Sequence, residues 1–412
     1  MAKLSFDILR NKNFRILLAT RTLALTAMQA QAVIVGWQVY DITGSTLMLG
    51  LTGLAEAIPA ITCALFAGHF VDTSHPRRVY SLCLAGLAIN TLLLFILAGG
   101  IVALDDTWLL VAIFGGIIAS GFIRSFIMPA TFTLLPRIVP REKYSAATSW
   151  QTAGHQIAFI GGPALGGLIY GGYGVGMAWF FALIVMFIAV ILTFAIKVDY
   201  KKRPPEEIRP PAFKSIKEGW VFLLHNRALL SIMSLDMLAV LFGGAIAILP
   251  AFADQVLGVG AEGLGLLRAA PALGAILTAL WFAVFPMQHI TAIKMLVVVA
   301  GFGASMIGFG LSTSFLWAVI FLSLSGAFDS VSMVIRGTMT QILTPEHMKG
   351  RVSAVNSMFI ISSNEIGAFQ SGLFASIFGL VPSIIIGGSG TLAVVGLIAW
   401  ISPAFRKLNM KT

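Results

Sequence analysis

Twelve apolar stretches dominate the chain and restrict how it can fold. A helix of about 20 residues rises about 30 Å, which is the thickness of the hydrocarbon core of a bilayer. The stretches, each long enough for that crossing, cover residues 14–40, 46–70, 77–99, 108–135, 144–171, 175–196, 227–253, 262–285, 291–311, 315–341, 352–379 and 382–403. Apolar residues make up 58% of the 412-residue chain and charged residues only 11%, a balance foreign to soluble domains. The sequence therefore predicts an all-α membrane protein with twelve transmembrane helices.

The basic residues indicate how these helices are oriented. When the loops are assigned to alternate sides, Lys and Arg fall on the side of the N-terminus, most densely in residues 197–227. The loops of the opposite side contain neither residue. Cytoplasmic loops are enriched in Lys and Arg, so we predict a multi-pass protein of the cytoplasmic (inner) membrane with both termini in the cytoplasm. The net charge of +10 follows from this topology, and we expect no nucleic-acid partner.

The two halves of the chain repeat each other. Asn13 and Asp41 recur as Asn226 and Asp254 with the same separation along the chain. Four further residues recur at a second, constant offset: Gly121, Arg124, Thr133 and Pro140 align with Gly326, Asp329, Thr338 and Pro345. Internal repeats of this kind are typical of transporter folds. We therefore predict two pseudo-symmetric six-helix bundles, over residues 1–197 and 225–412.

Residues 198–224 are predicted to form a cytoplasmic linker between the bundles. Four prolines and mixed charges occupy its first part, which suits a polar segment that does not pack into a core. Apolar residues then recur at every third or fourth position: Phe213, Ile216, Trp220 and Leu224. This spacing predicts a short amphipathic helix along the inner membrane surface.

Two opposite charges, Arg124 and Asp329, occupy equivalent positions of the repeat inside apolar stretches. A charge at the centre of a bilayer costs at least about 2.5–3.5 kcal/mol, so intramembrane ionisable residues usually have a function. We hypothesise that these two residues face each other across a central cavity, pairing in one access state and separating in another.

The turn between the second and third stretches contains Gly68, Asp72, Arg77 and Arg78. A glycine, an aspartate four residues later and a basic pair at the start of the next helix resemble the signature loop of the major facilitator superfamily. The resemblance implies a gating loop that holds the cytoplasmic gate shut in the outward-facing state. A purely topological role for the arginine pair is the alternative, because basic residues alone anchor the cytoplasmic end of a helix.

The fifth stretch contains Gly162, Pro163, Gly166 and Gly167, which match the core of the antiporter signature of the same superfamily. A proline bends a transmembrane helix, and glycines let a neighbouring helix approach closely. The match is partial, because Trp150 stands where the family pattern has a further glycine. Close helix packing without antiport explains the same residues equally well.

Three further segments resemble the branch of this superfamily that includes the enterobactin exporter and related drug/proton antiporters. They are Asn11, Phe14 and Arg15 at the start of the first stretch, residues 136–140 at the end of the fourth, and residues 344–353. The resemblance implies the major facilitator fold and a permease that drives a small molecule outward against proton entry, by alternating access.

In that fold the first, fourth, seventh and tenth helices line the cavity, and the intramembrane charges acquire candidate roles. The proton-coupling candidates are Asp236, Asp329, Glu365 and Glu56. The candidates for lining the substrate cavity are Arg21, Gln29, Trp37, Gln38, Arg124 and Arg336. A carboxylate that loses an arginine partner in a dry site can take up a proton. Static salt bridges that only fix helix packing are the alternative for each residue.

Other functional classes have less support. The chain lacks a phosphate-binding loop of the Gly-x-x-x-x-Gly-Lys type, and its six histidines form no metal-ligand pattern. We therefore expect no cofactor, no metal and no enzymatic activity, and a monomer whose partners are a small-molecule substrate, protons and the lipid bilayer. The alternatives to efflux of a siderophore or drug-like compound are proton-coupled import of a nutrient or metallophore and a non-transporting membrane sensor.

Overall fold

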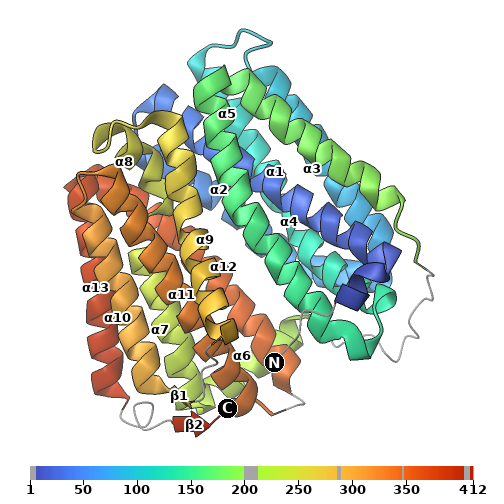
Figure 1. The fold of residues 1–412 in the computed structure, drawn as a ribbon, viewed down its shortest axis with the longest axis vertical. Helices are drawn as coiled ribbons and strands as arrows, with labels where there is room; N and C mark the ends of the chain where they lie inside the picture. Colours follow the sequence, from blue (N-terminus) through green and yellow to red (C-terminus); the bar gives the residue numbers. More distant parts are fainter. Residues whose placement is uncertain (1–5, 199–211, 285–288, 346–347, 403–408, 412) are drawn as a thin grey trace. The chain divides into compact units, whose positions relative to one another are not determined.

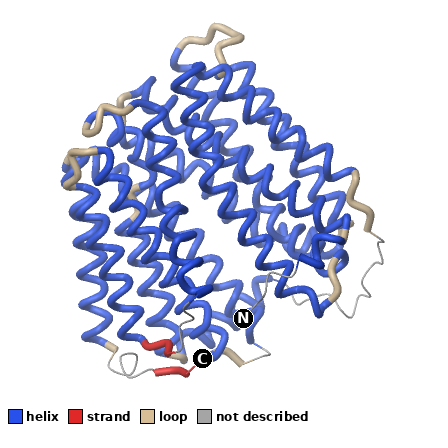
Figure 2. Tube along the Cα trace, viewed as in Figure 1, coloured by secondary structure: helices blue, strands red, loops and turns tan. Residues whose placement is uncertain are grey.

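A computed structural model describes residues 6–198, 212–284, 289–345, 348–402 and 409–411, and almost all of them are helical (Figures 1 and 2). The long helices are α1 (Lys12–Thr43), α2 (Thr46–Thr73), α3 (Pro76–Ala98), α4 (Asp106–Ile138), α5 (Tyr144–Phe194), α6 (Ala212–His225), α7 (Arg227–Gly243), α9 (Gly260–Val284), α10 (Ala292–Gly310), α11 (Phe315–Leu343), α12 (Lys349–Phe378) and α13 (Leu380–Ile401). The short elements are η1 (Phe6–Arg10), η2 (Arg141–Lys143), η4 (Ile246–Ile248), α8 (Leu249–Gln255), β1 (His289–Thr291) and β2 (Asn409–Lys411).

Ten helical segments among the described residues are long and apolar enough to cross a membrane. One of them, α5, contains two spans, because the backbone at Gly174 turns to a φ of 84° and interrupts the helix. A positive φ of this kind suits glycine, which has no Cβ. The eleventh predicted stretch forms α12, whose polar middle keeps it out of the apolar set. The predicted all-α membrane fold is confirmed.

The seventh predicted stretch, 227–253, is not one continuous helix. α7 ends at Gly243, η4 follows, and α8 begins at Leu249 with Pro250 in its first turn. Two consecutive glycines, Gly243 and Gly244, weaken the helix at this point, because glycine gives up more backbone freedom than any other residue when it becomes helical. The apolar composition that identified the stretch carries no signal of this break.

Contacts divide the chain into two compact units. The first comprises residues 1–42, 55–212 and 260–269, and the second comprises residues 43–54, 213–259 and 270–412. The start of α2 is thus counted with the second unit and the start of α9 with the first. Each unit has its own core of buried apolar side chains, with Tyr80 and Met186 in the first and Ile232 and Met339 in the second.

Equivalent glycines of the repeat bring equivalent helices together within each unit. In the first unit, a Cβ at Gly121 of α4 would collide with the backbone oxygen of Glu56 and approach Pro59, both on α2. In the second unit, a Cβ at Gly326 of α11 would collide with the backbone of Pro271 on α9. Glycine allows helix backbones to approach this closely in a membrane protein. The matching contacts show that Gly121 and Gly326 have the same structural role.

The structure alters one equivalence drawn from the sequence. The side chain of Asn226 accepts a hydrogen bond from the N–H of Leu229 (3.2 Å) and caps α7. In the first half, this capping role belongs to Asn11, whose side chain accepts from the N–H of Phe14 (3.1 Å). Asn13 instead exchanges two hydrogen bonds with the backbone of Lys197. The helix starts are therefore equivalent at Asn11 and Asn226, not at Asn13 and Asn226.

The predicted amphipathic segment forms α6, although the side chains of its first residues, including Phe213 and Ile216, lie outside the described set. Leu223 is fully buried against residues of α7 and α12. Glu218 forms an ion pair with Arg351 of α12 (2.8 Å), and the Trp220 ring packs 5.2 Å from that of Phe359. The end of α6 is therefore held onto α12. In other parts of the chain, β1 pairs with β2 in an antiparallel ladder.

Candidate functional site

The first unit contains an ion pair between Arg124 of α4 and Glu56 of α2. Arginine side chains in helices lean towards the N-terminus, and Arg124 follows the contact of Gly121 with α2 by one turn. That close approach places Glu56 within reach of the guanidinium group. The side chains of Arg124 and Glu56 are 40% and 29% exposed, so neither is fully buried.

The second unit contains a more deeply buried pair between Arg336 of α11 and Asp236 of α7, each with a side chain only 8% exposed. An arginine does not lose its proton in proteins. The charge of the buried Arg336 guanidinium is therefore permanent, and Asp236 supplies its anionic partner. Both members of this pair were separate sequence candidates, Asp236 for proton coupling and Arg336 for the substrate cavity, and the structure joins them.

Asp329 differs from these paired residues. It lies on α11 two turns before Arg336, on the same side of the helix, and it is partly buried. Among the described residues it takes part in no ion pair, whereas Glu56, Asp236 and Glu218 each have an arginine partner. Asp329 therefore differs from Glu56 and Asp236 in having no ion pair among the described residues.

The polar residues of α1 have separate partners in the first unit. Arg21 donates a hydrogen bond to the side-chain oxygen of Gln151 on α5. Gln38 is buried and bonded at both ends of its amide: its nitrogen donates to the carbonyl of Ala98 (2.6 Å), and its oxygen accepts from the indole of Trp179 (3.1 Å). Gln38 therefore joins three helices of the unit, and this geometry matches a structural role.

Gln29 and Trp37, the other α1 candidates, are half-buried. Trp37 packs edge-on against Tyr40, with ring centroids 6.5 Å apart. Gln29 lies where α1 meets α5, and a Cβ added at Gly162 of α5 would come within 2.7 Å of the Cβ of Gln29. The amides of Gln31 and Gln38 bond to residues of other helices, whereas that of Gln29 makes no hydrogen bond to another described side chain.

Glu365 lies in the middle of α12, half-buried. A Cβ at Gly53 of α2 would stand 3.5 Å from its carboxylate oxygen. Nearby, α2 and α12 come closer still. A Cβ at Gly372 of α12 would come within 2.7 Å of the Cα of Gly50 on α2. The start of α2 therefore packs directly on α12, next to Glu365.

The gating-loop candidates are described in part. α2 continues through Gly68 to Thr73, but the side chain of Asp72 lies outside the described residues. Arg77 donates a hydrogen bond to the carbonyl of Phe194 at the end of α5 (3.0 Å), and Arg78 is exposed. Arg77 therefore attaches the start of α3 to the last span of its own half.

His75 precedes α3 in this turn. Burial lowers the pKa of its imidazole below the usual 6.5, and the positive charges of Arg78, Arg137 and Arg77 lower it further. Each of these effects disfavours a second positive charge on the ring. His75 is consequently held neutral in the folded protein at pH values where a free histidine begins to take up a proton.

The glycines of the span 5 signature are packing positions. A Cβ at Gly166 would stand 2.9 Å from the Cα of Ala30 on α1, and one at Gly167 would stand 2.7 Å from the Cα of Gly265 on α9. A Cβ at Gly265 would in turn approach the carbonyl oxygen of Pro163 to 2.6 Å. The signature therefore lets α5 contact α1 on one side and the start of α9 on the other.

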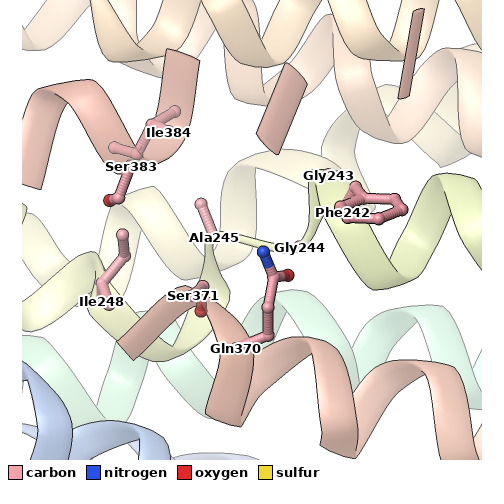
Figure 3. A pocket seen from close by; sticks show the side chains of 9 residues that line it. All are labelled: Phe242, Gly243, Gly244, Ala245, Ile248, Gln370, Ser371, Ser383 and Ile384. Atoms are coloured by element: carbon pink, nitrogen blue, oxygen red, sulfur yellow. The ribbon is translucent and has the colours of Figure 1, made fainter. Parts of the chain in front are cut away.

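Two polar features of the structure were not assigned a role from the sequence. Arg268 of α9 has a buried guanidinium nitrogen without a hydrogen-bond partner among the described residues. A small cavity of about 10 Å³ lies where α7 breaks, lined by Gly243, Gly244 and the side chains of Gln370 and Ser371 of α12 (Figure 3). Its volume suits about one water molecule. A polar residue inside an apolar stretch was the available signal in both cases.

The sequence profile described as Major Facilitator Superfamily matches residues 17–368. The chain is 25% identical over 403 residues to the enterobactin exporter EntS of Shigella boydii serotype 4 (strain Sb227), covering 96% of this chain and 93% of the relative. It is 25% identical over 405 residues, with the same coverage, to the enterobactin exporter EntS of Escherichia coli O127:H6 (strain E2348/69 / EPEC).

Solved structures share the fold at low sequence identity. A POT family transporter in complex with 5-aminolevulinic acid has a TM-score of 0.74 at 12% identity, covering 96% of this chain and 97% of that one. The human organic anion transporter MFSD10 (TETRAN) has a TM-score of 0.65 at 15% identity, covering 93% and 98%. The resemblance drawn from the signature loop, the span 5 glycines and the exporter-like segments is thereby confirmed.

Proposed function

Because this chain belongs to the Major Facilitator Superfamily, we propose that it is a proton-coupled exporter that moves a siderophore or drug-like small molecule out of the cytoplasm by alternating access. Membership makes it a multi-pass membrane transporter. Direction, coupling ion and substrate are the proposed parts. Direction and substrate rest on the similarity to the named relatives, and the coupling ion rests on the charges of the structure.

Outward transport of a siderophore-like compound is supported by likeness along the whole chain. The relatives named enterobactin exporter match over 96% of this chain. The match covers both halves, so no separate domain with another activity accounts for it. We propose that Arg21, Arg124, Gln29 and Trp37 contribute to the substrate cavity, because arginines bind anionic groups and aromatic rings contact apolar ones.

Proton coupling is supported by the contrast between Asp329 and the paired charges. Asp236 is held by Arg336 and Glu56 by Arg124, whereas Asp329 is partly buried without an ion pair among the described residues. A carboxyl group in such a place binds and releases a proton at a smaller cost than one held in a salt bridge. We assign the coupling proton to Asp329 first, with Glu365 and Glu56 as groups that act with it.

The gate and the orientation follow from the same proposal. The loop from Gly68 to Arg78 forms the cytoplasmic latch, with Arg77 tying it to the end of α5. Both termini lie in the cytoplasm, since the basic loops share their side. Treatment of intact cells with a protease should therefore leave tags at both ends uncut; cleavage of either tag would contradict this orientation.

The test is transport in inverted membrane vesicles, in which export appears as uptake. Vesicles containing the protein are given enterobactin as the first probe, and the lumen is acidified. We expect accumulation above that of vesicles without the protein, and loss of the accumulation when a protonophore collapses the gradient. Accumulation that ignores the gradient would refute proton coupling, and accumulation only in right-side-out vesicles would favour import.

Asp329→Asn is the matching variant, with Asp41→Asn as its control. Asp41 is an exposed carboxyl at the end of α1, so its replacement should leave transport unchanged. Asp329→Asn should lose gradient-driven accumulation while inserting at the normal level. A variant that transports at the normal rate and responds to the gradient would return Asp329 to a structural role.

A further inference from the structure

One face of α11 carries a line of polar residues from the middle of the helix to its last turn. Asp329, Ser332, Arg336, Thr340 and Thr344 follow one another at spacings of three or four residues. At 100° per residue the four helical positions, from Asp329 to Thr340, fall within an arc of about 80°, and Thr344 follows as the residue that caps the helix. The helical part of the stripe, from Asp329 to Thr340, is about 17 Å long at 1.5 Å per residue. It begins at Asp329 and ends at Thr344, just after the last residue of α11.

The hydroxyl groups of this stripe lack protein partners. The oxygens of Ser332, Thr340 and Thr344 are buried and make no hydrogen bond to any described group. Ser332 and Thr344 are only 3% and 4% exposed. An isolated hydroxyl is costly in an apolar environment, and helical serine and threonine usually remove that cost by donating to a carbonyl one turn earlier.

Other hydroxyls of α11 do use that local bond. Ser325 donates to the carbonyl of Leu322 (2.7 Å), and Thr338 donates to the carbonyl of Val334 (2.9 Å). Thr338 lies on the opposite side of the helix from Thr340. The hydroxyls without partners are therefore confined to the side of α11 that also carries Asp329 and Arg336.

The surroundings of the stripe contain both charge and space. Asp236 of α7 joins Arg336, so an ion pair lies in the middle of the stripe. Lys294 is the one charged residue of α10, which packs along α11. Beside the stripe, Met333 is 55% exposed, and a Cβ at Gly337 would have no neighbour within 4 Å. The surface of α11 at these two positions is therefore not covered by other described residues, and buried hydroxyls without a protein partner are groups that water can satisfy.

We propose that this face of α11 is a hydrated path that connects Asp329 with the cytoplasmic end of the helix. Water molecules in the path donate hydrogen bonds to the hydroxyl groups of Ser332, Thr340 and Thr344 and accept hydrogen bonds from them. The path also runs beside the Asp236–Arg336 pair. The path supplies the route by which Asp329 exchanges protons with the cytoplasm, and in this respect it rests on the proposed coupling. Its physical content, water along the stripe, is independent of that coupling.

Cysteine accessibility tests the path directly. Ser332→Cys, Thr340→Cys and the control Thr338→Cys are made in a chain with Cys63→Ala and Cys83→Ala, and inverted vesicles are treated with a membrane-impermeant thiosulfonate. We expect the two stripe positions to react at least about tenfold faster than the control. The reacting species is the thiolate, which attacks the reagent sulfur and displaces a sulfinate, and a dry apolar site disfavours formation of the thiolate. Rates equal to that of the control overturn the path.

A second measurement uses the unaltered chain, so its result does not depend on whether the cysteine variants fold. Hydroxyl radicals formed from water by X-ray exposure oxidise methionines that water touches. Met333 lies beside the stripe, whereas Met339 is fully buried. We expect Met333 to be oxidised and Met339 to be spared; protection of Met333 to the level of Met339 overturns the path.

The two proposals fail separately. Vesicle transport that ignores the proton gradient, together with rapid labelling at Ser332→Cys, removes the coupling and supports the path. Gradient-driven transport with unreactive stripe positions and a protected Met333 removes the path and leaves the coupling in place.

Discussion

The buried pair of Asp236 and Arg336 leads to a prediction in which the two single replacements differ. Asp236→Asn leaves a guanidinium group that keeps its charge in every accessible state. Arg336→Gln leaves a carboxyl group, which becomes neutral by binding a proton. Both side chains are only 8% exposed, so water compensates little in either case. Asp236→Asn should therefore destabilise the protein more than Arg336→Gln.

The magnitude follows from the cost of leaving one buried charge alone. Removal of one partner of a buried pair costs about 3–5 kcal/mol. For a folding unit of 150–250 residues, one kcal/mol lowers the melting temperature by about 2–4 °C. We expect Asp236→Asn to lower it by about 6–20 °C. The double replacement removes both charges and should recover most of this loss, because neutral polar pairs are cheaper to bury than a lone ion.

The assay is thermal unfolding of purified protein in detergent, followed by the fluorescence of a buried reporter or by loss of soluble monomer on heating. Wild type, both single variants and the double variant form a thermodynamic cycle. The exposed pair of Asp7 and Lys143 supplies the control, since Asp7→Asn should leave the melting temperature nearly unchanged. Equal losses for the two single variants, or a double variant that is as unstable as their sum, would refute the reasoning.

Three further predictions use the same unfolding assay. Gly167→Leu should lower the free energy of unfolding by at least about 1–3 kcal/mol, because its Cβ would meet the backbone of α9. Gly161→Leu on the same helix is the control and should be tolerated, because a Cβ at Gly161 has no neighbour within 4 Å. A tolerated Gly167→Leu would contradict the contact. Gln38→Leu should lower the free energy of unfolding by about 1–3 kcal/mol, because it leaves a buried indole N–H and a carbonyl unbonded. Gln29→Leu should lower it by less. The reverse order would show that Gln38 is not the structural residue. His75 has a pKa below 6.5 in the folded protein, so the unfolded chain binds a proton first and stability should fall as the pH drops below about 6.5. His75→Gln should flatten this fall between pH 7 and 5, and an unchanged pH profile would assign the fall to other groups.

Much of the fold was accessible to sequence reasoning because the bilayer imposes one strong rule. A span must be apolar for about 20 residues and must satisfy its own backbone, which leaves helices as the solution. Runs of apolar residues therefore revealed the helices, including the two that meet at Gly174. The break after Gly243 was not revealed, because a broken span and a continuous one have the same composition.

The candidate site was accessible only as a set of residues. Glu56, Arg124, Asp236 and Arg336 stood out as charges inside apolar stretches, and the same criterion identified Asp329. Which charges meet depends on helix rotation and on the approach of neighbouring backbones, and periodicity alone fixes neither. Arg124 bonds Glu56 on its own half because Gly121 brings α4 against α2. The pairing of Arg124 with Asp329 in another access state, suggested by the sequence, stays a prediction.

By itself the sequence determined that the chain is a helical membrane transporter with a repeated half, since apolar length, charge placement and the signature residues are properties of the linear chain. Only the tertiary structure decided which ionisable groups are neutralised by a partner and which hydroxyls of α11 are left without one. The physical reason is that pairing energies fall off within a few ångströms, so they depend on contacts between helices that are far apart in sequence.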